Sequence, residues 1–260
     1  MPTVHEIENA LYGWAPRELA ADWDNVGLLV GSGASKVSRV LIALDVTEWV
    51  ADEAIAQGAE LIVAHHPLMN CRWHEVQSVV DDNAQGRTIT KLLRNGVSAI
   101  CMHTNLDAAD GGVNDILAQK LGLEGLSMLN EEKIGRVGTL KCEKRLEQFL
   151  SDVIQLLGCR GLRYRDAGKT VHRVAVGGGA CAEYISNALA MGCDTFVTAD
   201  LKYHEFLDAN GINLIDAGHF ETENPVCGAI HDFLAERFPQ LAFILSTSHN
   251  KSVIEYYTET

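Results

Sequence analysis

Short apolar runs alternate with amphipathic segments along most of the chain. The apolar runs have the length of buried β-strands and are rich in Val, Ile and Leu. They cover residues 39–46, 60–66, 97–104, 172–178, 194–200, 212–219 and 241–248. Apolar residues at helical spacing predict helices over 3–12, 47–57, 86–95, 112–121, 143–157, 181–191, 202–209 and 224–237. Strands that alternate with helices in this way are typical of an α/β protein.

Polar residues and glycines mark the ends of several of these helices. Thr3 and Glu6 have the spacing of a capping box, which predicts a helix start close to the N-terminus. A glycine follows many of the predicted helices at the position where a left-handed residue ends a helix. These glycines are Gly58, Gly96, Gly122, Gly158, Gly192 and Gly211.

The pattern is repeated in the two halves of the chain. Residues 39–58 run from an Arg-Val strand start through a helix to a glycine, and residues 173–192 do the same over an equal length. A second pair of blocks follows in the same order, RNGVSAICMHT over 94–104 and ANGINLIDAGH over 209–219. The first copy is longer between its blocks, and the extra length falls in 67–86. Two matching blocks in one order indicate an internal repeat.

We therefore predict two similar α/β domains, formed by residues 1–125 and 126–260. The periodicity is interrupted between them, around 122–140. The C-terminal segment is expected to pack on the first half. In the alignment of the two copies, Thr104 corresponds to His219, so polar residues fall at matching edges of the two sheets.

Composition and charge limit the class of protein. The chain has 260 residues, 47% hydrophobic and 22% charged, which is enough apolar material for a core. The net charge of −14 disfavours general binding to nucleic acid, which needs clusters of Lys and Arg. No apolar run reaches the ~18 residues that predict a membrane span. A start without signal-peptide character and 7 scattered cysteines favour reduced, mostly buried thiols and a cytoplasmic protein.

Polar residues gather where the predicted strands end. In open α/β sheets, ligands bind at the carboxyl edge of the strands. His65 and His66 end one strand, and Pro67 predicts that the chain turns there, so that both imidazoles can reach one site. The other clusters at strand ends are 103–112, 199–204 and 218–223, with Asp45 as a further candidate.

A pair of metal ions explains these residue types. Imidazole and carboxylate together suit Zn, Mn, Fe or Co. The candidate ligands are His65, His66, Asp107, His219 and Glu223. They are too many for one catalytic zinc with an open position, and they fit two divalent ions about 3.5–4 Å apart. His103 is left as either a hydrogen-bond partner of a ligand or a proton donor.

Each cluster taken alone has a simpler explanation. A histidine at a strand end is most often only hydrogen-bonded. The carboxylates of 221–223 suit the start of a helix, and 107–112 suits a turn before a helix cap. Residues 177–179 are three glycines without the G-x-G-x-x-G spacing, which favours a tight turn over a phosphate loop. The metal hypothesis depends on the convergence of three separate clusters.

The same clusters carry a resemblance to a known family. The segments are DWDNVGLLVG (22–31), AHHPL (64–68), HTNLDAADGGVND (103–115), VTADLKYHE (197–205) and GHFETE (218–223). Together they resemble the GTP cyclohydrolase I type 2 homologues, also called Ngg-interacting-factor-like proteins, and the match runs in order over nearly the whole chain. Ala199 stands where the family commonly has glycine, and the large insertion that some relatives carry between the halves is missing.

The resemblance implies two similar α/β domains with a dinuclear metal site in the cleft between them. It implies the same five ligands, with Glu223 bridging the two ions, and a toroidal homohexamer as the assembly. His103 and His204 correspond to other positions that line the site in the family. We take His103 and Glu223 as the candidate catalytic residues.

These features lead to one functional hypothesis and one alternative. The hypothesis is a metal-dependent hydrolase of a small nucleotide-like substrate, for which GTP cyclohydrolase-type ring opening is one reaction. The sequence contains neither a Walker loop nor an obvious Arg/Lys cluster for a triphosphate. The alternative is a non-enzymatic metal-binding ring that binds a partner protein, so the sequence leaves open whether the protein is an enzyme.

Overall fold

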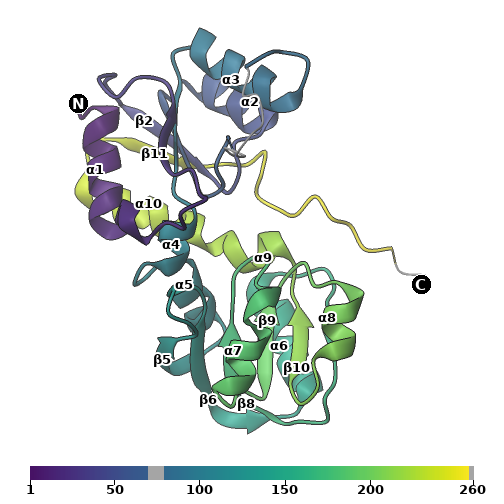
Figure 1. Ribbon diagram of the computed structural model, residues 1–260. Helices are drawn as coiled ribbons and strands as arrows, with labels where there is room; N and C mark the ends of the chain where they lie inside the picture. Colours follow the sequence, from purple (N-terminus) through teal and green to yellow (C-terminus); the bar gives the residue numbers. More distant parts are fainter. Residues whose placement is uncertain (70–78, 258–260) are drawn as a thin grey trace. The chain divides into compact units, whose positions relative to one another are not determined.

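The computed structural model describes residues 1–69 and 79–257, and the chain forms two compact units (Figure 1). Unit 1 consists of Met1–Ala109 and Val226–Asn250, and unit 2 consists of Asp110–Pro225 and the chain from Lys251 on. The units change over at Ala109, whereas the sequence pattern set the boundary at residue 125. The intervening helix packs on the second sheet, where Leu117 and Ala118 belong to the hydrophobic core of unit 2.

Unit 1 contains a five-stranded mixed sheet in the order β1-β4-β3-β2-β11. Its strands are β1 (Gly27–Val30), β2 (Arg39–Ala43), β3 (Leu61–Ala64), β4 (Ser98–Cys101) and β11 (Ala242–Leu245). All pairs are parallel except β1 with β4. The C-terminal strand β11 therefore joins the first sheet beside β2. Its helices are α1 (Val4–Trp14), η1 (Arg17–Leu19), α2 (Glu48–Gln57), α3 (Ala84–Arg94), α4 (Thr104–Ala108) and α10 (Pro225–Arg237).

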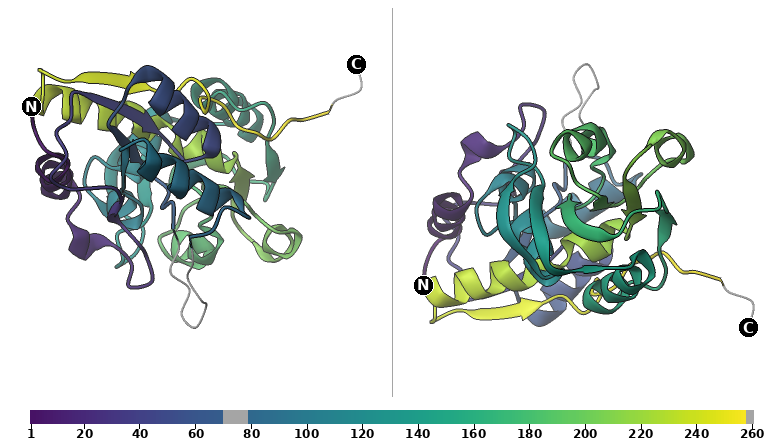
Figure 2. Two further views of the ribbon diagram at one scale, coloured as in Figure 1. Left: turned by 90° about the horizontal axis from the view of Figure 1, so that it is seen from above. Right: turned by 90° about the horizontal axis from the view of Figure 1, so that it is seen from below.

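The helices of unit 1 cover both faces of this sheet. Val50 and Ala54 of α2 and Leu92 of α3 pack in one hydrophobic cluster with strand residues such as Leu41 and Ile62. On the other side lie α1 and α10, and α10 runs alongside β11 (Figures 1 and 2). The buried sheet and its near-continuous apolar strands agree with the apolar runs of the sequence.

Unit 2 contains a six-stranded mixed sheet in the order β5-β6-β8-β9-β10-β7. Its strands are β5 (Leu123–Met128), β6 (Arg136–Lys144), β7 (Arg163–Arg165), β8 (Val171–Val176), β9 (Thr195–Thr198) and β10 (Asn213–Asp216). Its helices are α5 (Val113–Lys120), α6 (Leu146–Leu157), η2 (Ala182–Tyr184), α7 (Ile185–Ala190), α8 (Tyr203–Asp208) and α9 (His219–Glu223). Helices α5 and α6 contribute to one hydrophobic cluster and α7 to another, so apolar side chains cover both faces of this sheet too.

The two sheets share a four-strand arrangement. In unit 1, β2, β3 and β4 are parallel neighbours, and the preceding strand β1 pairs antiparallel with β4. In unit 2, β8, β9 and β10 are parallel neighbours, and the preceding strand β7 pairs antiparallel with β10. This common order is what the repeat in the sequence predicts. The protein is thus an α/β protein with two mixed sheets.

The predicted elements are present with small changes at their ends. Thr3 and Glu6 form the predicted capping box, in which Thr3 N donates to Glu6 Oε2 at 2.6 Å and Glu6 N donates to Thr3 Oγ1 at 3.2 Å. Gly58 ends α2 with a left-handed φ of 66°. Short elements that the pattern did not predict are η1, β1, β7, α4 and α9, together with the β5–β6 hairpin.

The described cysteines are reduced. They form no disulfide, and all are buried except Cys142, while Cys71 lies outside the described residues. Burial raises the pKa of the Cys101 and Cys159 thiols to about 12. These thiols are small core side chains, as their apolar sequence context predicts.

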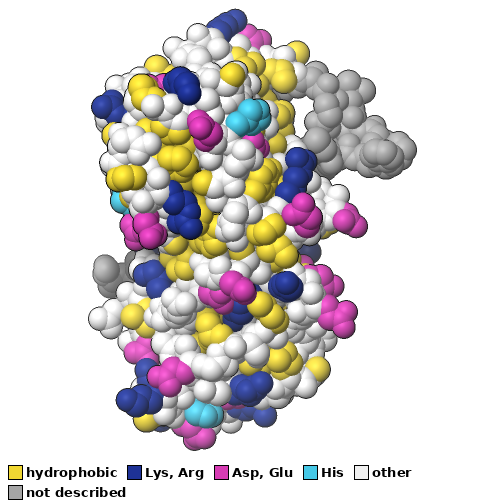
Figure 3. Space-filling model, turned by 90° about the vertical axis from the view of Figure 1, so that its left-hand side faces the viewer, with side chains coloured by type: hydrophobic (Ala, Val, Ile, Leu, Met, Phe, Trp, Pro, Cys, Tyr) yellow, Lys and Arg dark blue, Asp and Glu magenta, His cyan; other side chains and the backbone are white. Residues whose placement is uncertain are grey.

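On the face in Figure 3, Lys and Arg side chains are scattered among acidic ones rather than gathered in a patch. Among the helices of residues 1–69 and 79–257, none has the length and the apolar character needed to cross a membrane.

Candidate metal centre

Three histidines of unit 1 lie together at the carboxyl ends of two neighbouring strands. His65 and His66 follow β3, and His103 follows β4. The ladder between these strands ends with Ala64 opposite Cys101, so the residues after each strand meet at one edge. One ligand nitrogen from each of the three rings lies within 4.8 Å of the others. This cluster is called the unit 1 half-site below, together with Asp107.

The chain leaves the sheet at the histidine pair, as predicted. Strand β3 ends at Ala64, and the backbone N–H groups of His65 and His66 both donate to Leu44 O, at 3.1 and 2.9 Å. The pleat no longer sends the two side chains to opposite faces, and the ring centroids lie 5.0 Å apart.

Each ring of the unit 1 half-site is held through the same nitrogen. His65 Nδ1 lies 2.7 Å from Met102 O, His66 Nδ1 lies 2.7 Å from Asp45 Oδ1, and His103 Nδ1 lies 2.9 Å from Asp24 Oδ1. A carbonyl or carboxylate oxygen only accepts, so the proton of each neutral ring sits on Nδ1. Nε2 then carries the lone pair, which is the tautomer of a histidine that binds a metal.

The carboxylates behind two of the rings are held in the ionised form. Burial raises the pKa of Asp24, but hydrogen bonds from His103 and Thr104 outweigh it and keep the pKa well below the ordinary value. The pKa of Asp45 is lowered in the same way, against burial, by hydrogen bonds from His249 and His66. An ionised carboxylate on Nδ1 raises the electron density at Nε2 and strengthens it as a ligand.

Asp107 joins this half-site from the short helix α4. The helix starts directly after His103, and Asp107 N donates to His103 O at 3.0 Å. The carboxylate oxygen Oδ1 lies 3.6 Å from His65 Nε2, which is too long for a direct hydrogen bond. Two donors that each bind one ion at about 2.1 Å are separated by roughly this distance. The donor set of unit 1 therefore fits a divalent cation.

Unit 2 carries a second pair of candidate ligands on α9. His219 and Glu223 are one turn apart, and His219 Nε2 lies 3.0 Å from Glu223 Oε2. His219 Nδ1 lies 2.7 Å from Asp200 Oδ2, so this ring has the same support through Nδ1 as the three rings of unit 1. His219, Glu223 and Asp200 are called the unit 2 half-site below.

The backbone around Asp200 explains how it reaches His219. Among the described non-glycine residues, positive φ occurs at Lys133 (63°) and Asp200 (56°). Aspartate is one of the few residues that tolerates the left-handed region, and here it turns the carboxylate toward the ring. Ala199, which stands where the family commonly has glycine, has an ordinary φ, so this replacement adds no backbone strain.

The three glycines at 177–179 form a tight turn against α9. Gly178 N donates to Asn114 Oδ1 at 2.9 Å, and Gly179 N donates to Thr222 Oγ1 at 3.0 Å. Gly179 has a φ of +64°, and a Cβ at this position would lie 2.2 Å from Glu223 Oε1. The turn thus needs glycine because its backbone approaches the carboxylate of Glu223 closely.

Comparison with known proteins identifies the family. The family model of Duf34/NIF3 (NGG1p interacting factor 3) matches residues 2–251. The chain belongs to the Duf34/NIF3 family. It is 34% identical over 253 residues to a GTP cyclohydrolase 1 type 2 homolog of Clostridium perfringens, which covers 94% of this chain and 95% of the relative. A GTP cyclohydrolase 1 type 2 homolog of Streptomyces coelicolor is 35% identical over 241 residues, 87% of this chain and 84% of its own.

Solved structures of the same fold cover nearly the whole chain. A Bacillus cereus protein related to NIF3 has a TM-score of 0.89 at 27% identity and covers 98% of this chain and 99% of its own. A hypothetical protein of Staphylococcus aureus has a TM-score of 0.88 at 28% identity and covers 99% and 100%. The two-sheet α/β architecture of this Duf34/NIF3 protein is therefore shared with its relatives.

The two half-sites contain all the predicted ligands. Unit 1 collects His65, His66 and Asp107 with His103, and unit 2 pairs His219 with Glu223. Whether all five ligands bind one pair of ions stays a prediction, as does the catalytic role of His103. His204 lies on α8, where its ring centroid is 5.4 Å from that of Tyr203.

Sequence reasoning missed two residues that support the histidines. Asp24 was contained in the family segment 22–31 but was not singled out, although it accepts from both His103 and Thr104. His249 was not recognised at all, and its Nε2 lies 2.7 Å from Asp45 Oδ2. No local pattern marks His249, because its position depends on β11 returning to the first sheet.

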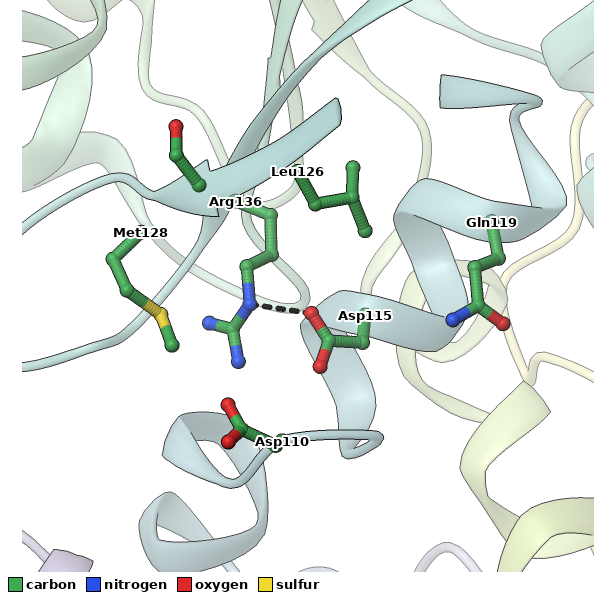
Figure 4. A pocket seen from close by; sticks show the side chains of 7 residues that line it. Asp110, Asp115, Gln119, Leu126, Met128 and Arg136 are labelled. Atoms are coloured by element: carbon green, nitrogen blue, oxygen red, sulfur yellow. Dashed lines mark hydrogen bonds and ion pairs between the residues drawn. The ribbon is translucent and has the colours of Figure 1, made fainter. Parts of the chain in front are cut away.

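A cavity of about 270 Å³ in unit 2 lies apart from these residues (Figure 4). It is lined by Asp110, Asp115 and Arg136 among others, and by none of the predicted site residues. The buried Arg136 donates from Nε to Asp115 Oδ1 at 2.5 Å and from Nη1 to the carbonyls of Lys133 and Gly135. These bonds make Arg136 a structural residue of the β5–β6 hairpin.

Proposed function

We propose that this Duf34/NIF3 protein is a hydrolase that binds two divalent metal ions and acts on a small nucleotide-like substrate. The observation that carries the proposal is that four histidines share one hydrogen-bonding arrangement. His65, His66, His103 and His219 each have Nδ1 within hydrogen-bond distance of an oxygen acceptor, so each ring is oriented through Nδ1 and Nε2 is the atom that would bind a metal. Support through Nδ1 is the arrangement found at histidines that bind a metal, and at His219 the carboxylate of the second candidate ligand, Glu223, lies 3.0 Å from Nε2.

In this proposal the two half-sites contribute to one dinuclear centre, in the cleft between two α/β halves related by the repeat. His65, His66 and Asp107 supply donors from unit 1, and His219 and Glu223 supply donors from unit 2. Glu223 would be the ligand shared by the two ions, as the family resemblance implies. Mixed imidazole and carboxylate donors suit Zn, Fe or Mn, so the donor set does not select one metal.

The chain's own residues position a substrate and move a proton. When bound, a pair of divalent ions supplies positive charge that polarises a substrate oxygen and acidifies water. His103 Nε2 is the atom we assign to proton transfer, because Asp24 holds the ring in one orientation and stabilises it when protonated. Gly179 keeps the backbone close to Glu223 without a side chain in the way.

An exposed aromatic side chain supports a substrate with a flat ring. Trp23 has 67% of its surface exposed, and its ring centroid lies 6.1 Å from that of His103 at an angle of 74°. A free indole face beside the half-site suits stacking of a base. The relatives carry the name GTP cyclohydrolase 1 type 2 homolog, and ring opening of a guanine nucleotide is the reaction of this type that we propose to test first.

The test combines metal loading with a substrate panel. The protein is prepared with Zn, Mn or Fe, and GTP, other nucleotides and phosphoesters are assayed for turnover. Glu223→Gln and His65→Ala are expected to lose metal and turnover while circular dichroism stays unchanged. His231→Ala serves as the control, because this histidine lies on α10 and pairs with Asp232. Full metal occupancy without turnover on any substrate favours the non-enzymatic ring that binds a partner protein.

The assembly is a separate part of the proposal. We propose a toroidal homohexamer, as the resemblance to the family implies. Light scattering coupled to size exclusion measures the mass directly, and a monomer at micromolar concentration would contradict it.

A further inference from the structure

Asp45 is bound on both of its carboxylate oxygens by histidines from distant parts of the chain. His66 Nδ1 lies 2.7 Å from Oδ1, and His249 Nε2 lies 2.7 Å from Oδ2. The three side chains form a continuous row, His249–Asp45–His66, at the edge of the first sheet. His249 is buried and His66 is partly buried, whereas 37% of the Asp45 side chain is exposed, so the row is sheltered at its two histidines and open to solvent at the carboxylate.

The turn that carries His249 is itself fastened to unit 1. Strand β11 pairs with β2, and Ser246 N extends this ladder by donating to Ile42 O at 2.8 Å. The carboxylate of Glu53 on α2 then accepts from Ser246, Thr247 and Ser248. These bonds come from Ser246 Oγ (2.6 Å), Thr247 N (2.9 Å), Thr247 Oγ1 (2.7 Å), Ser248 N (3.1 Å) and Ser248 Oγ (2.7 Å). Five bonds to one carboxylate fix the chain immediately before His249.

We propose that His249 is a positioning residue for the metal-binding nitrogen of His66, and that the 246–249 turn thereby forms part of the unit 1 half-site. The inference rests on the proposed role of His66 as a ligand. A carboxylate held on one oxygen rotates about its own bonds, whereas one held on both oxygens keeps its plane. Because Asp45 keeps its plane, the ring of His66 keeps its orientation and Nε2 keeps its direction.

The positions of these residues in the fold support a positioning role for the row His249–Asp45–His66 and not an incidental contact. Asp45 follows β2, His66 follows β3, His249 follows β11, and Glu53 lies on the helix between β2 and β3. Three parallel strands end at the edge where the half-site lies, and each contributes one member of the row. The C-terminal strand therefore has a role beyond covering the edge of the sheet.

The experiment measures metal affinity of the full-length chain by competition with a chelator, with Zn²⁺ and Co²⁺ as the probes. Asp45→Ala is expected to weaken binding about 10- to 100-fold, which is the usual effect of losing the hydrogen-bond partner of a ligand, and His249→Ala, which acts through Asp45, is expected to weaken it by up to about 10-fold. His249→Gln is expected to restore most of the affinity, because its side-chain N–H can still donate to Asp45. The absorption spectrum of bound Co²⁺ is expected to change in His249→Ala and to return in His249→Gln.

Two further variants separate positioning from simple stabilisation. Ser38→Ala removes the bond from Ser38 Oγ to Glu60 Oε1 (2.8 Å) before the start of β2, at the opposite end of this strand from Asp45, so it is expected to lower thermal stability slightly and leave metal affinity unchanged. In an Asp45→Ala background, His249→Ala is expected to add no further loss of affinity, since the two residues act through one row.

The outcomes distinguish this inference from the proposed function. If His66→Ala weakens binding while His249→Ala leaves the affinity and the Co²⁺ spectrum unchanged, His249 is only structural and the inference is wrong. If His66→Ala itself has no effect on metal binding, His66 is not a ligand, and both the proposed centre and this inference fail.

Discussion

A methyl group added at residue 179 tests whether Glu223 has to lie where the structure places it. In Gly179→Ala the new Cβ would lie 2.2 Å from Glu223 Oε1 and 3.1 Å from His219 Nε2, so the carboxylate has to move. The backbone adds a second effect, because alanine at a φ of +64° costs about 1 kcal/mol relative to glycine. The substitution therefore has two effects at once: it lowers the stability of the fold, and it displaces the candidate ligand Glu223.

A matched control separates the two effects. Gly168 has a φ of +73°, and a Cβ added there meets no atom within 4 Å. Gly168→Ala is expected to cost the same ~1 kcal/mol in stability and to leave metal binding unchanged. Gly179→Ala is expected to lose about 10- to 100-fold in metal affinity as well, which corresponds to ~1.4 to 2.8 kcal/mol of binding free energy.

The assay is chelator competition with Zn²⁺ on both variants, with urea unfolding of the metal-free proteins as the measure of stability. If the two variants bind metal equally well, either Glu223 is not a ligand or its carboxylate moves at no cost. That result would refute the reasoning that connects the glycine turn to the metal centre.

Three further predictions concern other parts of the chain. Hydrogen bonds from the 246–248 turn outweigh partial burial and lower the pKa of Glu53 to about 2. The ionised carboxylate therefore stabilises the folded protein above the unfolded-state pKa, and this stabilisation is lost as pH falls from about 4.5 toward 2. Glu53→Gln is expected to lower the free energy of unfolding by about 1 kcal/mol at pH 7, with the difference from wild type shrinking over that range in urea titrations. Trp23→Ala is expected to leave thermal stability nearly unchanged and to raise the KM of a nucleotide substrate about tenfold, whereas an unchanged KM would exclude stacking on this side chain. Among the described cysteines, Cys142 is expected to react first with a maleimide at pH 7, while Cys101 and Cys159 stay unmodified in peptide mass spectra of the native protein.

Local patterns in the sequence were enough to predict most of the secondary structure. Apolar runs bounded by turn residues predicted the parallel strands, since a strand buried on both faces needs apolar side chains at successive positions. The elements that were missed lack this signal. Strand β7 reads Arg-Tyr-Arg at a sheet edge, and β1 is four residues long with a shift in its register. Helices α4 and α9 have five residues each, too few for a helical period to show.

The sequence by itself also determined which side chains are candidate ligands. Histidines and carboxylates followed the ends of parallel strands, and parallel strands end at one edge, so the half-sites were predictable in composition. Only the tertiary structure decided which residues form hydrogen bonds with the histidine rings and with the carboxylates that support them. Asp24 reaches His103, Asp45 reaches His66, and His249 reaches Asp45. These partners come from separate strands and loops, and their contacts depend on strand order and register, which a local pattern does not contain.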